Sequence, residues 1–218
     1  MNYIVLSPGR CGSIFLGVFL EQYFRIVNPP GHKLFPLTKE SNNTLSVDIH
    51  PLIHCHVPQL IQPLLSSYKL IIIKRNVVEI TGSAVIAELT NKWYFAGANR
   101  KKDRTEYIEK YKDQTFTVDT HDFMNRVRYF CEWYVSVQTI LDQAIVLKYD
   151  QAIDPESIFQ CLNLSPVAIS NEFLLEPQPF DKWEKLQNSD KLKIAGNKVF
   201  SVYQEKYPKI FNEDHFKY

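Results

Sequence analysis

The stretch that decides the fold class reads Ile4-Val5-Leu6-Ser7-Pro8-Gly9-Arg10-Cys11-Gly12-Ser13-Ile14-Phe15-Leu16-Gly17-Val18-Phe19-Leu20. A short apolar run stops at Ser-Pro-Gly, passes an arginine and resumes as a helix-like apolar stretch. This pattern predicts a strand that turns sharply into a helix whose first backbone N–H groups are exposed. Such a helix start favours phosphate-like anions, because it combines unpaired donors with a partial positive charge. We therefore expect an enzyme that handles a phosphate or sulfate group, with Arg10 opposing the charge on a leaving group.

Two widespread nucleotide-binding motifs do not fit this stretch. The P-loop motif G-x-x-x-x-G-K-[ST] fails because Gly9 and Gly12 are too close and no lysine precedes Ser13. The dinucleotide motif G-x-G-x-x-G fails as well. Ordinary ATPases, GTPases and dehydrogenases therefore have little support.

Length and composition are those of a globular protein. The 218 residues, 45% of them apolar, predict a single domain over 1–218, with a mainly helical C-terminal part from about residue 176. The 25 basic residues nearly balance the 24 acidic ones. Net charge therefore gives no argument for nucleic acid or an anionic membrane as partner.

The four cysteines are widely spread and form no C-x-x-C pair. This pattern indicates neither a disulfide scaffold nor a zinc site, and it favours a reducing cytoplasm. No lysine or arginine precedes the first apolar run, unlike in a signal peptide. The sequence also has no stretch of 18 apolar residues, so we expect no membrane span.

Four segments are predicted to be strands. The run Lys69–Lys74 is the clearest, because a continuous β-branched run is typical of a parallel strand covered on both faces. His50, His54 and His56 are expected in a turn after the second strand. The expected strands are residues 3–6, 45–49, 69–74 and 144–148.

Helices are expected between these strands. Asn76 with Glu79 resembles an N-cap and its capping partner, and Asp154-Pro155-Glu156 is a good helix start. Residues 91–120 are expected to form a loop and a short helix that cover the carboxyl edge of the sheet. The expected helices are residues 12–24, 58–65, 76–89 and 121–143, one from 154, and a polar one to about 207.

This alternation predicts an α/β fold with three layers, α/β/α, around a central parallel sheet. Ligands of such sheets lie beyond the carboxyl ends of the strands. Four residues follow predicted strands or lie in the turns after them, and we expect them to share one crevice. They are Arg10, His56, Arg75 and Tyr149.

Four segments, in order, resemble the sulfotransferases that use 3′-phosphoadenosine 5′-phosphosulfate (PAPS). The segment Pro8–Ile14 is similar to the family's P-[KR]-S-G-[ST]-[ST] loop, with one residue inserted before the arginine. Cys55-His56-Val57-Pro58 resembles its T-H-x-P turn. Arg75 with Ser83 has the spacing of its 3′-phosphate site, and Leu147–Asp150 followed by Asp154-Pro155 is similar to its Y-E-D-x(n)-P segment. The resemblance spans roughly residues 3–165.

The resemblance implies a P-loop-like fold that transfers a sulfuryl group in line from PAPS to a hydroxyl or amine. His56 would be the catalytic base and Arg10 would support the leaving phosphate, with no metal required. The acceptor would be a small molecule or a glycan, with no nucleic acid or membrane as partner. The implied cofactor-binding residues are Gly9, Arg10, Cys11, Gly12, Ser13, Ile14, Arg75, Ser83 and Tyr149.

The chain also departs from the family's pattern. Cys11 and Ile14 replace residues with hydroxyl groups, and the late Arg-Lys-Gly segment is absent, since Lys191 and Lys193 do not form it. His50 and His54 compete with His56 as the base. Two other functions stay open: a nucleotide-dependent small-molecule kinase, and a non-catalytic relative that binds a nucleotide.

Overall fold

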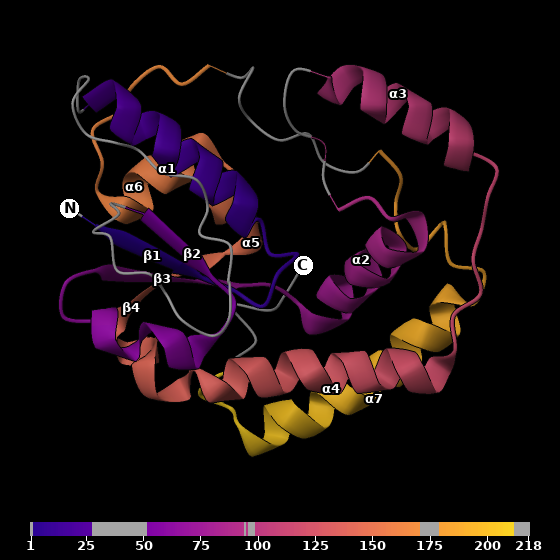
Figure 1. Ribbon diagram of the computed structural model, residues 1–218. Coiled ribbons are helices and arrows are strands. Elements are labelled where there is room, and N and C mark those ends of the chain that lie inside the picture. The colour runs from indigo at the N-terminus through magenta and orange to yellow at the C-terminus, as the bar shows by residue number, and fades with distance from the viewer. Residues whose placement is uncertain (1, 28–51, 94, 96–98, 171–178, 212–218) are drawn as a thin grey trace. The chain divides into compact units, whose positions relative to one another are not determined.

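The computed structural model describes residues 2–27, 52–93, 95, 99–170 and 179–211 (Figure 1). The chain divides into two compact units. Unit 1 comprises Met1–Lys74 and Ser136–Leu174, and unit 2 comprises Arg75–Val135 and Leu175–Tyr218. The expected strand at 45–49 and His50 lie outside the described residues.

Unit 1 contains an all-parallel sheet of four strands in the order β2-β1-β3-β4. The strands are β1 (Tyr3–Leu6), β2 (Leu52–Cys55), β3 (Lys69–Lys74) and β4 (Ala144–Lys148). The predicted α/β class with a parallel sheet is thereby confirmed. Strands β1, β3 and β4 have the predicted bounds, because continuous apolar runs of this kind fit a strand covered on both faces.

Strand β2 corrects the expectation of a histidine-rich turn. Leu52–Cys55 pairs with β1, with Leu52 opposite Tyr3 and Cys55 opposite Leu6. Its side chains alternate between half-buried and buried positions, as expected of a strand at the edge of a sheet. His54 is therefore a strand residue, whereas His56 lies just beyond the strand.

Helices α1 (Ser13–Val27) and α6 (Pro155–Leu162) lie side by side in unit 1 (Figure 1). Aromatic side chains join them. Phe19 and Phe159 have ring centroids 5.2 Å apart, and Phe24 lies 6.0 Å from Tyr3 of β1. Helix α1 thus covers the face of the sheet to which Tyr3 points. The short helix α5 (Tyr149–Ala152), which was not predicted, follows β4 directly.

Two segments of unit 1 that were predicted to be helical form 3-10 helices. One is Pro58–Leu64, where Pro63 has no N–H group for a regular helical hydrogen bond. The other is Gln138–Gln143, in which the Ile140 N–H donates to the Val137 carbonyl at 3.0 Å. The predicted helix 121–143 is therefore confirmed as far as Ser136 and wrong beyond it, where Gln138–Gln143 forms a separate 3-10 helix.

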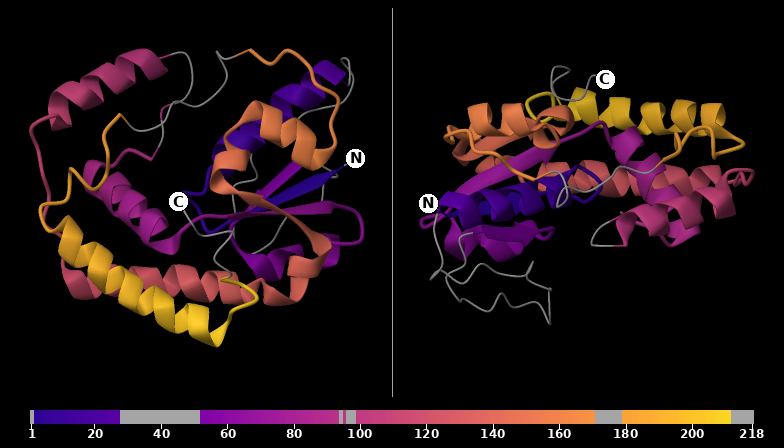
Figure 2. Two further views of the ribbon diagram at one scale, coloured as in Figure 1. Left: turned by 180° about the vertical axis from the view of Figure 1, so that it is seen from behind. Right: turned by 90° about the horizontal axis from the view of Figure 1, so that it is seen from above.

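Unit 2 consists of α2 (Val77–Thr90), α3 (Arg100–Tyr111), α4 (Thr120–Ser136) and α7 (Ser189–Lys206). Helices α4 and α7 run side by side, and Tyr203 of α7 bonds to Glu132 of α4 at 3.2 Å (Figure 2). The predicted cap of α2 is confirmed, since Asn76 Oδ1 accepts hydrogen bonds from the N–H groups of Val78 and Glu79.

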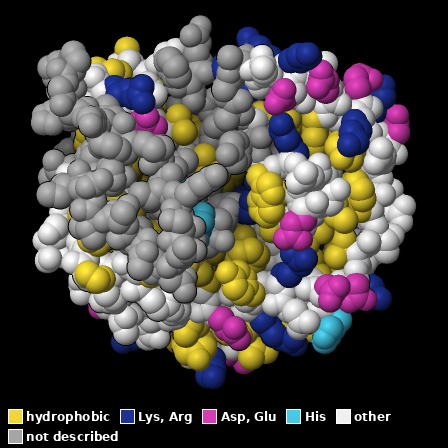
Figure 3. Space-filling view, in the orientation of Figure 1, with side chains coloured by type: hydrophobic (Ala, Val, Ile, Leu, Met, Phe, Trp, Pro, Cys, Tyr) yellow, Lys and Arg dark blue, Asp and Glu magenta, His cyan; other side chains and the backbone are white. Residues whose placement is uncertain are grey.

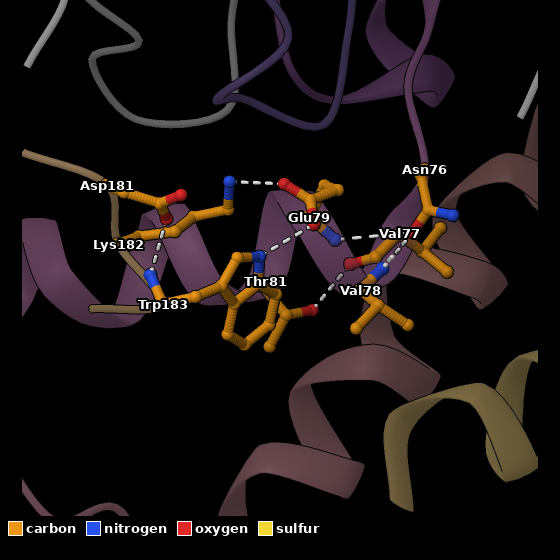
Figure 4. A network of polar contacts seen from close by, with 8 residues as sticks. All are labelled: Asn76, Val77, Val78, Glu79, Thr81, Asp181, Lys182 and Trp183. Atoms are coloured by element: carbon orange, nitrogen blue, oxygen red, sulfur yellow. Dashed lines mark hydrogen bonds and ion pairs between the residues drawn. The ribbon is translucent and has the colours of Figure 1, made fainter. Parts of the chain in front are cut away.

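The Glu79 carboxylate at the start of α2 binds two residues of the C-terminal segment (Figure 4). Trp183 Nε1 donates to it at 2.8 Å, and the Lys182 amine forms an ion pair with it. Asn76 and Thr81 satisfy backbone groups of the same helix turn. This network attaches the segment before α7 to the first turns of α2.

Candidate functional site

The loop between β1 and α1 has an unusual backbone. Gly9, Arg10 and Gly12 all have positive φ angles, of 87°, 55° and 80°. Arg10 is not a glycine, and such a residue in the left-handed region is a strained feature that concentrates at functional sites. A positive φ curves the backbone, and curved loops are able to present N–H groups to an anion.

Hydrogen bonds within the loop maintain its shape. The Gly9 N–H donates to Ser7 Oγ at 3.3 Å, and the Cys11 thiol donates to the Gly9 carbonyl at 3.1 Å. Cys11 is fully buried, so its side chain braces the turn and leaves only its backbone for an anion. The sulfotransferase loop that this segment resembles has a hydroxyl group at this position. In this chain the Cys11 thiol has a structural role instead.

Gly12 is required by its surroundings as well as by its φ angle. A Cβ at this position would lie 2.7 Å from Ile153 Cγ2 and 3.5 Å from two ring carbons of Tyr149. The loop is therefore in contact with α5 and with Ile153, the residue that follows it. Among the predicted site residues, the structure brings Tyr149 to the loop.

Helix α1 begins directly after Gly12, whose carbonyl accepts from the Leu16 N–H at 3.0 Å. Ser13 is the first helical residue and is buried, and Ile14 is half-buried. The first N–H groups of any helix have no partner within the helix and carry the positive end of its dipole. Strand order also reverses around β1, which is where ligands of open parallel sheets bind.

His56 lies against this loop. Its Nδ1 is 2.6 Å from the Ser7 carbonyl, and its Cε1 is 4.0 Å from the Cβ position of Gly9. Because a carbonyl oxygen only accepts, Nδ1 carries the hydrogen, and Nε2 of the neutral ring has the lone pair. His56 is exposed, so this arrangement suits a base that takes a proton from a bound substrate.

His54 lies beside His56 but is unsuited to the role of base. The two rings are in edge contact, with centroids 4.5 Å apart. Burial, and secondarily the nearby His56, lowers the pKa of His54 to about 3. Its Nε2 is buried and has no hydrogen-bond partner. Of the two described histidines near the loop, His56 has the geometry of a base.

Arg75 and Ser83 belong to unit 2, whereas the loop and both histidines belong to unit 1. Arg75 follows β3 directly, and its N–H donates to Tyr134 Oη at 3.2 Å. Ser83 is buried in α2, with 9% of its surface exposed. Their role in binding a 3′-phosphate stays a prediction.

Three features of the site were not found from the sequence. The Ser7 carbonyl holds His56, but a backbone group leaves no mark in the residue pattern. His54 was placed in a turn, because Leu52-Ile53-His54-Cys55 does not alternate strictly between apolar and polar residues and so gives no clear strand signal. Nothing in the sequence indicated that Ile153 lies against Gly12.

Charge and metal ligands add little to the site. Basic and acidic side chains alternate over the described part of the face in Figure 3. Among the described residues, no group of three or more His, Cys, Asp or Glu side chains is placed to hold a metal. No helix within the described ranges is both long and apolar enough to cross a bilayer.

Comparisons of the sequence give no relative. No protein-family model matches the chain, and no curated protein sequence matches it.

Proposed function

We propose that this protein transfers a sulfuryl group from PAPS to a hydroxyl or amine acceptor, with His56 as the base. The observation that carries the proposal is the contact of His56 with the loop before α1. This contact places a proton acceptor next to a backbone turn that is suited to a phosphate or phosphosulfate. The ordered resemblance of four segments to the PAPS-dependent family supports the same function.

The residues of the loop fit an anionic group. Three positive φ angles within Gly9–Gly12 curve the backbone, and the start of α1 adds the positive end of a helix dipole. Bound there, PAPS would supply an activated sulfuryl group whose leaving group is a phosphate. Arg10 and the first N–H groups of α1 would oppose the negative charge that develops on that phosphate.

The proton of the acceptor goes to Nε2 of His56. As the new bond between the acceptor oxygen and sulfur forms, the bond between sulfur and the leaving phosphate oxygen breaks. The imidazolium that results keeps its Nδ1–H bond to the Ser7 carbonyl, and a charged donor strengthens such a bond. His56 thus has a defined proton acceptor atom and a partner for the charge it acquires.

The first test is thermal stability with 3′-phosphoadenosine 5′-phosphate (PAP), the desulfated product, compared with ATP and magnesium. Saturation at about 100 times Kd adds about 2.7 kcal/mol, which raises Tm by about 5–10 °C for a chain of this size. We expect this shift with PAP, and its loss in Arg10→Met. The exposed Lys101→Met on α3 is the matched control.

The outcomes separate the three functions. A shift with ATP and magnesium alone would support the kinase. The non-catalytic relative would be supported by two results together. PAP would raise Tm, and no PAP would be released from PAPS with any acceptor or with water. In a sulfotransferase, His56→Ala keeps the PAP shift and reduces turnover by about 100-fold or more.

A further inference from the structure

The pairing of His54 with His56 is not used by the proposed mechanism. His54 is opposite Val5 of β1, and its side chain points to the same face of the sheet as Tyr3. His56 is two residues further on and contacts the loop at Ser7 and Gly9. The two imidazoles meet at 76° with centroids 4.5 Å apart.

The His54 ring is half-buried, with its Nε2 atom inaccessible, and it is not a second base. Its Nε2 is buried without a hydrogen-bond partner, so it cannot reach a substrate proton in this arrangement. Burial lowers its pKa to about 3, which keeps the ring uncharged at neutral pH. An uncharged ring next to His56 does not repel the imidazolium that His56 becomes when it accepts a proton.

We propose that His54 is a positioning residue that holds the imidazole of His56 edge-on, so that Nδ1 stays on the Ser7 carbonyl and Nε2 stays available to the acceptor. This inference rests on the proposed role of His56 as base. The hydrogen bond to Ser7 fixes one atom of the ring but leaves rotation about the N–O line. The contact with His54 restricts that rotation, because edge contacts between aromatic rings favour a defined relative orientation.

The position needs an uncharged aromatic ring and not the nitrogens of histidine. His54→Phe keeps a ring of similar size without titratable atoms. His54→Leu fills part of the same volume without a ring, and His54→Ala removes it. The phenylalanine variant is therefore the conservative rescue, and the other two are independent ringless variants in case one of them fails to fold.

The tautomer of His56 is the first readout, and it requires no substrate. Long-range ¹H–¹⁵N spectra of the full chain at about pH 7 distinguish Nδ1–H from Nε2–H rings. We expect His56 to be in the Nδ1–H form in the parent protein and in His54→Phe. In His54→Leu or His54→Ala we expect a mixture of both tautomers. An unchanged Nδ1–H tautomer in the ringless variants would overturn the inference.

The second readout is release of PAP from PAPS with water as acceptor. Here water gives its proton to His56, its oxygen bonds to sulfur, and PAP leaves with inorganic sulfate as the other product. We expect the ringless variants to lower kcat by about tenfold or more with KM for PAPS little changed, since misorientation of a base affects only the transition state. His54→Phe should restore most of kcat, and the exposed His121→Ala is the control.

The results distinguish the two proposals. If the parent protein neither binds PAP nor releases it from PAPS, the proposed function fails, and the tautomer spectra still test the contact. If the parent is active and the ringless variants match it, only the role of His54 fails. If His54→Phe is as poor as His54→Ala, a nitrogen of His54 is needed, and the positioning role is wrong.

Discussion

Gly9 and Gly12 share a left-handed backbone but differ in what surrounds them. Among the described residues, a Cβ at Gly9 would meet only His56 Cε1, at the ordinary contact distance of 4.0 Å. A Cβ at Gly12 would lie 2.7 Å from Ile153 Cγ2, which is closer than real carbon atoms approach. The two positions therefore separate the cost of a positive φ from the cost of a steric clash.

We expect Gly9→Ala to destabilise the protein by about 1–2 kcal/mol, the cost of an alanine in the left-handed region. Gly12→Ala should cost about 2–5 kcal/mol, because overpacking adds to the same strain. Urea unfolding of the two variants measures both free energies. Equal losses at the two positions would contradict the close packing of Ile153 on the loop.

Among the elements, β3 ends in an unusual residue. Lys74 has only 4% of its surface exposed, whereas Lys69 at the other end of the strand is exposed. Burial lowers the pKa of Lys74 to about 8 from 10.5. Between these two values the unfolded chain binds more protons than the folded one, so stability from this group rises as pH rises.

Lys74→Met removes this dependence. The quantity to compare is the unfolding free energy of the parent minus that of Lys74→Met. We expect this difference to be constant below pH 8 and to increase by about 3 kcal/mol between about pH 8 and about pH 10.5. Chemical unfolding at several pH values measures the difference, with Lys69→Met as the control at the exposed end. A difference independent of pH would show that Lys74 titrates normally.

Helix α2 is joined to the segment before α7 by a largely buried ion pair (Figure 4). The side chains of Lys182 and Glu79 are 17% and 12% exposed, and Trp183 bonds to the same carboxylate. Removing one member of such a pair leaves an uncompensated charge, which is worse than removing both.

We expect Lys182→Met to cost about 3 kcal/mol of unfolding free energy, and the double variant Lys182→Met with Glu79→Gln to recover part of that loss. Thermal and urea unfolding of the single and double variants test this. The exposed pair Lys102–Glu106, at 3.8 Å on α3, is the control, and its loss should cost less than about 0.5 kcal/mol. Additive losses would show that Glu79 and Lys182 do not interact.

At the scale of the whole molecule, Arg75–Val135 of unit 2 is inserted between β3 and the chain that leads to β4. Arg75 and Tyr134, near the two ends of this insertion, are joined by a hydrogen bond of 3.2 Å. A long loop between two paired strands costs closure entropy, and joining its ends reduces that cost. Folding of the insertion therefore favours the pairing of β3 with β4.

Tyr134→Phe removes only the hydroxyl and should lower stability by about 1 kcal/mol, the usual net value of one hydrogen bond. Tyr129→Phe on the same helix is the control, since Tyr129 is 61% exposed. Hydrogen exchange of β3 and β4 amides is the sharper measurement, and we expect faster exchange only in Tyr134→Phe. Unchanged exchange in Tyr134→Phe would show that the pairing of β3 with β4 does not depend on the hydrogen bond between Arg75 and Tyr134.

Much of the fold could be predicted because its signals are local. Short runs of residue types predicted the bounds of β1, β3 and β4. They also predicted the Asn76 cap and the sharp turn after Leu6. Within the site, the sequence indicated the glycine-rich loop and His56. Roles for Arg75 and Ser83 stay predictions, because both residues belong to unit 2 whereas the loop belongs to unit 1.

By itself, the sequence determined that a buried parallel strand turns into a helix at a glycine-rich loop, since apolar runs and glycines act on their own neighbours. Only the tertiary structure decided that Leu52–Cys55 is a strand, because an edge strand forms by pairing with β1. It also decided that Trp183 reaches Glu79 across 104 residues. Finally, it distinguished His54 from His56, because burial lowers the pKa of His54 to about 3, whereas His56 is exposed and held by the Ser7 carbonyl.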